Sequence, residues 1–300
     1  MFPDTYVKLV QEGQTHDYRQ HAPIARGLGG CLSLCLRAHR HGVRTKGRLT
    51  MQASRLGFRW RISGPPGPPL TLSLLFAEAV RAMVFRAAER RGLMPLPDAF
   101  HGGGEAPHTH AYWLAEDADA DGLTDHVTLY AASGLPEGLI PVLAEGGEIA
   151  LRLVSGTRLP GAPECWRLLP DWMEGQGPVR LFGPGRVWVS ETPFVTPQWV
   201  WRERTKNGVP RPGRDIAGQV ARELQRRGLP APEVVEVLPG AGVVAPWIGV
   251  AGYARSLAGR RPPPDAQAAQ IRIFFGQAVE GPLALGFAAH FGLGLLRHEK

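Results

Sequence analysis

Hydrophobic and polar residues alternate over residues 53–63, as they do in a strand buried on one face. Glycines and prolines at 64–69 then predict a turn. Over 71–91 the apolar residues recur every three to four positions and stop at Gly92, which predicts a helix. Its predicted buried face consists of Leu72, Leu75, Phe76, Ala79, Met83 and Ala87.

The next segments continue an alternating order of elements. Strand-like runs at 110–115 and 126–132 flank an acidic loop at 116–125, which predicts a hairpin. A short helix at 136–145 and a strand at 148–155 follow. From 53 to 155 the order is therefore strand, helix, strand, strand, helix, strand, which is the ferredoxin-like order.

The second half begins after a glycine- and proline-rich stretch near 175–178. Its pattern predicts a helix at 215–227 with Asp215 as N-cap. Strands are predicted at 179–182, 186–190, 234–238 and 271–275. We therefore expect an α+β protein with a second, degenerate ferredoxin-like (RRM-like) unit whose second helix is missing or short. The predicted parts are a basic N-terminal segment (1–52), a first domain (53–175) and a second domain (176–300).

Charge is distributed unevenly along the 300 residues, although the formal net charge is only +7. Residues 1–50 hold eight Lys and Arg against three acids, and 202–227 repeat that balance. Residues 100–175 hold twelve acids against three Arg. Clustered Arg favours a phosphate backbone as partner, with ordinary solvated charge as the alternative.

The sequence predicts neither a membrane partner nor secretion. No apolar run is long enough to span a bilayer, and the first residues lack the charged and apolar regions of a signal peptide. We therefore expect a cytoplasmic protein.

The acidic loop resembles the front of a calcium-binding loop. Asp117, Asp119, Asp121 and Asp125 occupy positions 1, 3, 5 and 9, with Gly122 at position 6. Thr128 stands where the bidentate Glu belongs, and the flanks read as strands. We therefore expect these aspartates to form Asx-type turns and assign no metal, with a lone cation loop as the alternative.

The histidines near the hairpin fall into two groups. If residue 115 faces 126, about 16 Å separates His110 from His126, so one ion cannot bridge them. His126 then belongs with the acidic loop, whereas His108, His110 and Tyr112 share one strand face. RNA cleavage through the 2'-hydroxyl needs a base, an acid and nearby cations, and histidine suits the proton transfers. The alternative for each histidine is an ordinary surface loop residue.

The C-terminal run from 281 to 294 is rich in glycine. Gly286, Gly292 and Gly294 could let backbone N–H groups converge on a phosphate. Neither the P-loop pattern nor the dinucleotide fingerprint fits. The alternative is a tight turn before a last strand.

Together these segments resemble a known family. A ferredoxin-like pair ending in a glycine-rich loop is similar to the RAMP superfamily of CRISPR proteins, especially the repeat-processing endoribonuclease called Cas six. The run from His108 to His126, with Gly281–Gly286 and His290–Gly294, looks like the fused Cas five and Cas six subunit of type I-G (I-U) systems. The resemblance covers 53–300. Only a basic segment of about 50 residues precedes this region. We therefore expect a stand-alone or truncated Cas six-like protein.

The resemblance implies metal-independent cleavage of precursor CRISPR RNA in the repeat, leaving a 2',3'-cyclic phosphate, with no cofactor. It also implies retention on the guide RNA (crRNA), with other subunits of a type I effector complex as partners. His108, His110 and His290 are the candidate catalytic histidines, with Tyr112 as candidate helper, and the choice of base stays open. Residues expected to hold RNA are Arg202, Arg204, Lys206, Arg211, Arg214, Arg222, Arg226, Arg227, Arg255, Arg260, Arg261, Gly286, Gly292 and Gly294.

Two other functions fit the sequence. One is a non-catalytic RNA-binding subunit of a type I CRISPR effector complex. The other is a calcium-dependent binding module built on Asp117–Asp125.

Overall fold

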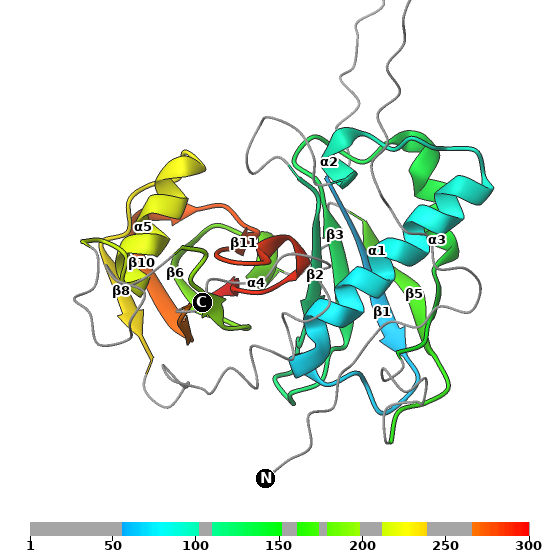
Figure 1. The fold of residues 1–300 in the computed structure, drawn as a ribbon, viewed down its shortest axis with the longest axis horizontal. Coiled ribbons are helices and arrows are strands. Elements are labelled where there is room, and N and C mark those ends of the chain that lie inside the picture. The colour runs from blue at the N-terminus through cyan, green and yellow to red at the C-terminus, as the bar shows by residue number, and fades with distance from the viewer. Residues whose placement is uncertain are drawn as a thin grey trace, which may run out of the picture. The chain divides into compact units, whose positions relative to one another are not determined.

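The structure is a computed structural model that describes residues 56–101, 110–151, 161–173, 179–198, 212–238 and 266–299. Helices and strands are mixed along the chain (Figure 1). The antiparallel strands form two five-stranded sheets. None of the described helices combines the length and apolar character needed to cross a membrane. The predicted N-terminal segment (1–52) lies outside the described residues.

The first sheet has the strand order β2-β3-β1-β5-β4. Every pairing in it is antiparallel. Its strands are β1 (Gly57–Ser63), β2 (Tyr112–Glu116), β3 (His126–Tyr130), β4 (Gly147–Ile149) and β5 (Trp166–Met173). The helical elements of this half are η1 (Leu70–Leu72), α1 (Ser73–Arg90), α2 (Asp98–His101), η2 (Glu137–Leu139) and α3 (Ile140–Glu145).

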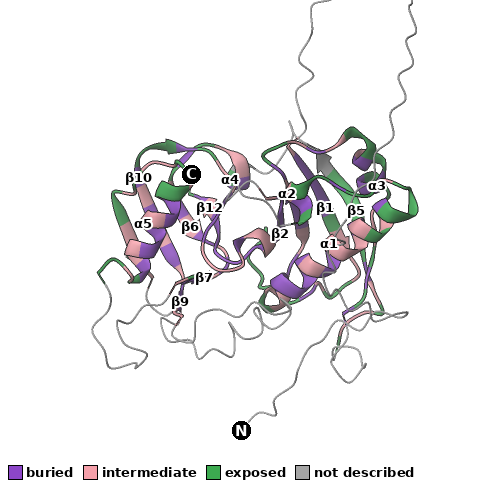
Figure 2. Cartoon of the chain, turned by 45° about the horizontal axis from the view of Figure 1, so that its top comes forward, coloured by how far each residue is buried: buried purple, intermediate pink, exposed green. Residues whose placement is uncertain are grey.

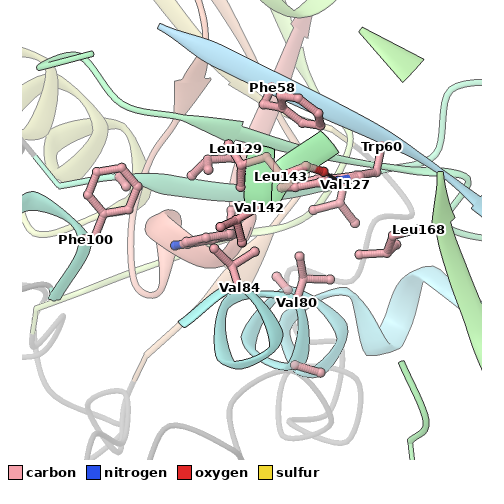
Figure 3. Close-up of a cluster of buried hydrophobic side chains, with 14 of the residues drawn as sticks. Phe58, Trp60, Val80, Val84, Phe100, Val127, Leu129, Val142, Leu143 and Leu168 are labelled. Carbon is pink, nitrogen blue, oxygen red and sulfur yellow. Dashed lines mark hydrogen bonds between the residues drawn. The ribbon is translucent and has the colours of Figure 1, made fainter. Parts of the chain in front are cut away.

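Helices α1 and α3 cover one face of this sheet and form the larger core. Phe58 and Trp60 on β1 pack with Val80 and Val84 of α1 (Figure 3). Most residues of α1 that do not face the core are half-buried, and Figure 2 shows the helix mainly in purple and pink. Its last residues, Glu89 and Arg90, are exposed. The indole N–H of Trp60 donates to the Leu143 carbonyl over 2.8 Å, so this buried polar group is satisfied. The helix predicted at 71–91 is confirmed, but its buried face is only partly the predicted one. Leu75, Phe76 and Ala79 are buried as predicted, whereas Leu72, Met83 and Ala87 are half-buried, and Val80, Val84 and Ala88 take the central positions.

The opposite face of the first sheet carries buried charge. Arg59 is 8% exposed and forms ion pairs with Glu116 at 3.1 Å and Asp171 at 2.9 Å. The Thr128 hydroxyl also donates to Glu116. Successive side chains of a strand point to opposite faces of the sheet. The charged side chains therefore lie on the face opposite to the core. A buried charge is tolerated here because each partner is paired.

The second sheet has the order β11-β12-β6-β10-β8. Helix α5 packs on it through Ile216, Val220 and Leu224, and Asp215 caps α5 by accepting the Gly218 N–H over 3.1 Å. The strands are β6 (Gly185–Ser190), β8 (Val234–Val237), β10 (Ile271–Val279), β11 (Leu283–Ala284) and β12 (Leu295–His298). The other elements are α4 (Val179–Phe182), α5 (Ile216–Arg226), η3 (Ala289–Phe291) and the paired strands β7 (Phe194–Val195) and β9 (Ala268–Ala269).

The two sheets repeat one strand order. In the first, β1 lies between β3 and β5, and β2 follows β3 at the edge. In the second, β6 lies between β10 and β12, and β8 follows β10 at the edge. Among the described elements, the central strand β1 precedes α1, the longest helix of the first half, and β6 precedes α5 with only the two-residue strand β7 between them. In the second half, η3 stands where the first half has α3.

Two sequence expectations are wrong. Residues 179–182 form the helix α4 and not a strand. Four residues with Arg180 among them are too few to show a period, and Leu181 packs against Tyr112 and Leu114. In the hairpin, His126 pairs with Glu116 and not with residue 115. The register is shifted by one residue, with the Asp125 N–H donating to the Glu116 carbonyl over 2.9 Å.

The predicted strand at 148–155 is observed as the short β4, and β5 was not predicted. The last strand β12 agrees with the alternative interpretation of 281–294, a turn before a last strand. Strand β5 contains Pro170 and several polar residues, so its apolar pattern is weak.

Glu191 joins the two halves. Its carboxylate accepts the N–H of Asp117 at the end of β2 over 2.7 Å. Removal of this carboxyl group from water raises its pKa to about 8, and the negative charge of Glu116 adds to the increase. Glu191 is therefore protonated in the folded protein at neutral pH but ionised in the unfolded chain.

This difference predicts that stability falls as pH rises. The folded pKa lies above the unfolded value, so the folded state binds the extra proton between about pH 4.5 and 8 and loses that stabilisation across this window. We expect Glu191→Gln to flatten the decline in the free energy of unfolding, measured by urea denaturation at several pH values. The exposed Glu89→Gln is the control, and an unchanged decline in Glu191→Gln would contradict the assignment.

Candidate functional site

Two histidines and a tyrosine from distant parts of the chain meet in one cluster. The ring of His290 in η3 lies 5.1 Å from the ring of His110 and 4.5 Å from that of Tyr112, between centroids. Tyr112 is the first residue of β2, and His110 precedes it by two residues. Three of the predicted catalytic residues are thus neighbours, while His108 lies outside the described residues.

Glycine at position 292 allows η3 to approach β2. Gly292 has φ +85°, and a Cβ there would lie 3.3 Å from the backbone nitrogen of Ala115. Its carbonyl accepts the Thr192 hydroxyl over 2.5 Å. A side chain at this position would meet both backbone strain and the neighbouring strand. The close approach holds His290 beside Tyr112.

A polar stripe on α5 faces the same cluster. Gln219, Glu223 and Arg227 recur every four residues, next to the apolar stripe that packs on the sheet. One carboxylate oxygen of Glu223 accepts the Gly286 N–H over 2.7 Å, and the other accepts Arg227. Glu223 therefore connects α5 to the glycine-rich segment that carries His290. Gln219 is tied down by Gln198 and by the Arg214 carbonyl.

Between α5 and this segment lies a pocket of about 310 Å³. Arg227 places its guanidinium carbon 5.9 Å from the centre of the Tyr112 ring. The pocket is lined by Pro197, Gln198, Gln219, Arg222, Glu223, Arg226, Arg227, Gly286, Ala289 and His290. The pocket is thus basic and has one of the clustered histidines in its wall.

Burial affects the ionisation of Tyr112. Desolvation raises the pKa of its phenol above the ordinary value, Arg227 lowers that pKa and Glu223 raises it. The phenol therefore keeps its proton at neutral pH and can donate a hydrogen bond. Imidazole side chains can both take up and release protons, so His110 and His290 bring the chemistry of proton transfer to this cluster.

The predicted RNA-binding residues divide into three groups. Arg222, Arg226 and Arg227 line the pocket, and Arg214 lies just before α5. The glycine N–H groups of the C-terminal segment bond within the protein, Gly286 to Glu223, Gly292 to Ala289 and Gly294 to Pro193. These bonds position His290. Because the same N–H groups already have acceptors within the protein, the structure does not support a phosphate contact by them. The remaining basic residues, Arg202, Arg204, Lys206, Arg211, Arg255, Arg260 and Arg261, lie outside the described residues.

The acidic loop is separate from this cluster, at the opposite end of β2. Candidate ligand atoms of Asp117, Asp119 and Asp125 lie within 4.8 Å of one another. The carboxylates of Asp117, Asp119 and Asp121 accept N–H groups of the loop itself, which is the Asx-turn pattern.

His126 lies with this loop and not with His110. Its ring nitrogen is 3.7 Å from Asp171. Burial and the charge of Arg59 lower the pKa of His126, which favours its neutral form at neutral pH.

Sequence reasoning missed Glu223, the residue that organises the site. A signal was present, because Gln219, Glu223 and Arg227 precede or follow the apolar residues Val220 and Leu224 at a fixed helical spacing. A polar stripe flanking the buried stripe of a helix indicates a second contact surface.

Comparisons with known proteins find distant structural similarity and no sequence match. No family model matches the sequence, and no curated protein matches it. Among solved structures, the chain is similar to one described as "An RAMP protein binding different RNA substrates", with 11% sequence identity and a TM-score of 0.36. That match covers 82% of this chain and 100% of the other.

Opposite charges beside Tyr112 predict opposite effects on its pKa. Arg227→Gln removes the cation that lowers the pKa, so it should rise further. Glu223→Gln removes the anion that raises it, so it should fall. The measurement is alkaline titration of tyrosinate absorbance, with Tyr112→Phe identifying the signal. Shifts in the same direction would contradict this electrostatic account.

Proposed function

We propose that this protein is a metal-independent endoribonuclease that cleaves RNA through the RNA's own 2'-hydroxyl. The observation that carries the proposal is the meeting of His110, His290 and Tyr112 beside an arginine-lined pocket. This reaction needs groups that transfer protons and cations that stabilise the phosphate. Two imidazoles, a protonated phenol and fixed guanidinium groups meet those needs.

The reaction uses these groups in one displacement. A histidine takes the proton of the 2'-hydroxyl, and the 2'-oxygen bonds to phosphorus. The bond from phosphorus to the 5'-oxygen breaks, and an acid protonates that oxygen. The products are a 2',3'-cyclic phosphate and a free 5'-hydroxyl. One of His110 and His290 is the base and the other is the acid, and the choice between them stays open. Tyr112 donates a hydrogen bond to the phosphate oxygens.

The positions of the two histidines support their roles in proton transfer. His290 lines the pocket, whereas His110 is not among its lining residues and its ring lies 5.1 Å from that of His290. The Nδ1 atom of His110 is buried and has no hydrogen-bond partner among the described residues. Because substrate cannot reach a buried atom, proton transfer by His110 would use its other ring nitrogen, Nε2.

The repeated strand order supports a tandem ferredoxin-like arrangement of the RAMP kind, with η3 replacing the second helix of the second unit. With the motif resemblance, this leads to precursor CRISPR RNA as the proposed substrate, cut within the repeat. We further propose that the protein stays on the mature guide RNA within a type I effector complex. A non-catalytic RNA-binding subunit would use the same arginines without the histidines.

Single substitutions separate the enzyme from the pure binder. His110→Ala and His290→Ala should each lower the single-turnover cleavage rate on cognate repeat RNA by about 100-fold or more, because each removes a proton-transfer group. RNA affinity should stay within about threefold of the wild type, because the pocket arginines that hold phosphates remain in place.

The controls test the rest of the proposal. His126→Gln, outside the cluster, should leave the rate unchanged, as should EDTA. A 2'-deoxy nucleotide at the cleavage site should abolish product. Tight, salt-sensitive binding by the wild type without any defined cut would contradict the enzyme and leave the binding subunit.

A further inference from the structure

The pocket under α5 contains guanidinium groups that the protein itself leaves without acceptors. The Nε and Nη2 atoms of Arg222 and the Nε atom of Arg227 are buried and have no hydrogen-bond partner among the described residues. The side chain of Arg227 is only 9% exposed. A buried donor without an acceptor destabilises the folded protein, and more so when it is charged.

Charge in this pocket is positive and only partly balanced. Glu223 is paired with Arg227 and also holds the Gly286 N–H, so both of its oxygens are occupied. Arg222 and Arg226 contribute two further charges to the wall. No other carboxylate lines the pocket among the described residues. The site therefore lacks a compensating anion.

The geometry matches a tetrahedral oxyanion with several acceptor oxygens. Guanidinium forks bind carboxylates and phosphates through paired N–H groups. Guanidinium groups from three arginines offer donors in several directions, which suits the tetrahedral oxygens of a phosphate better than the planar pair of a carboxylate. A volume of about 310 Å³ holds a phosphate with part of its attached sugar.

We infer that Arg222 and Arg227 form a binding site for a single phosphate group, with His290 at its edge. This inference rests on the proposed function, because it identifies the group as the phosphate next to the cleaved bond. It goes further in predicting that a mononucleotide 3'-phosphate, which resembles the end left by cleavage, binds without the rest of the RNA. Glu223 is then a positioning residue that fixes the Arg227 fork.

Calorimetry on the full chain tests the site without any cleavage. The probes are adenosine 3'-monophosphate, inorganic phosphate and adenosine. We expect the nucleotide and inorganic phosphate to bind, with adenosine at least tenfold weaker than the nucleotide. Arg222→Gln and Arg227→Gln should each weaken nucleotide binding at least tenfold, whereas the exposed Arg90→Gln on α1 should change it less than twofold.

Conservative variants guard against loss of folding. Arg222→Lys and Arg227→Lys keep the charge but lose the fork, so their affinity should lie between the wild type and the Gln variants. Circular dichroism confirms that each variant is folded. Equal nucleotide affinity in the wild type and folded Gln variants would overturn the phosphate site.

Two further experiments complete the test. A competition experiment identifies the source of the phosphate, and a cleavage assay separates the phosphate site from the proposed ribonuclease. Repeat RNA with a 2'-deoxy nucleotide at the cleavage site should displace the mononucleotide, and failure to compete would mean that free phosphates and not RNA occupy the pocket. Arginine-dependent nucleotide binding without RNA cleavage would sustain the pocket and reject the ribonuclease. RNA cleavage together with nucleotide binding that is unchanged in the Arg222 and Arg227 variants would sustain the ribonuclease and reject the phosphate site.

Discussion

The contact of η3 with β2 is the constraint on which the candidate site depends. Gly292 approaches the backbone of Ala115 closely, and the Thr192 hydroxyl holds the Gly292 carbonyl. Because of this contact, a histidine near the C-terminus lies against residues 110–112, about 180 positions earlier in the chain. The apolar contacts of Leu295 and Ala289 with Tyr112 and Leu114 support the same junction.

Glu223 extends this constraint to the charged part of the site. A buried carboxylate is costly unless it is bonded, and here one oxygen bonds the glycine-rich segment and the other bonds Arg227. The same residue thus fixes the backbone before His290 and the cation near Tyr112. Structural stability and site geometry are therefore properties of one interaction. Loss of Glu223 should disturb both at once.

The sequence predicted those features that depend on local pattern. The period of 215–227 and its N-cap Asp215 gave α5, and alternation gave β1, β3 and β6. The same-face relation of His110 and Tyr112 follows from strand geometry. The choice of His290 came from resemblance, because no local pattern shows which strand a glycine-rich loop meets.

Other features could not be read from local pattern. The segment 179–182 is too short to carry a period, and its helix is set by packing of Leu181 onto the first sheet. The hairpin register depends on how many loop residues the aspartates tie into turns. The raised pKa of Glu191 depends on a contact between halves of the chain. Each of these is fixed by tertiary structure.

The central claim is that RNA is cleaved where the two halves meet, with its phosphate between the α5 arginines and the paired histidines. A crystal structure of the full chain with 2'-deoxy-blocked repeat RNA tests it most directly. The account predicts the blocked phosphate in the pocket, with its oxygens within about 3.2 Å of the Arg222 and Arg227 nitrogens and the reacting nucleotide beside His110 and His290. RNA bound on another surface, with this pocket free of phosphate, would contradict it.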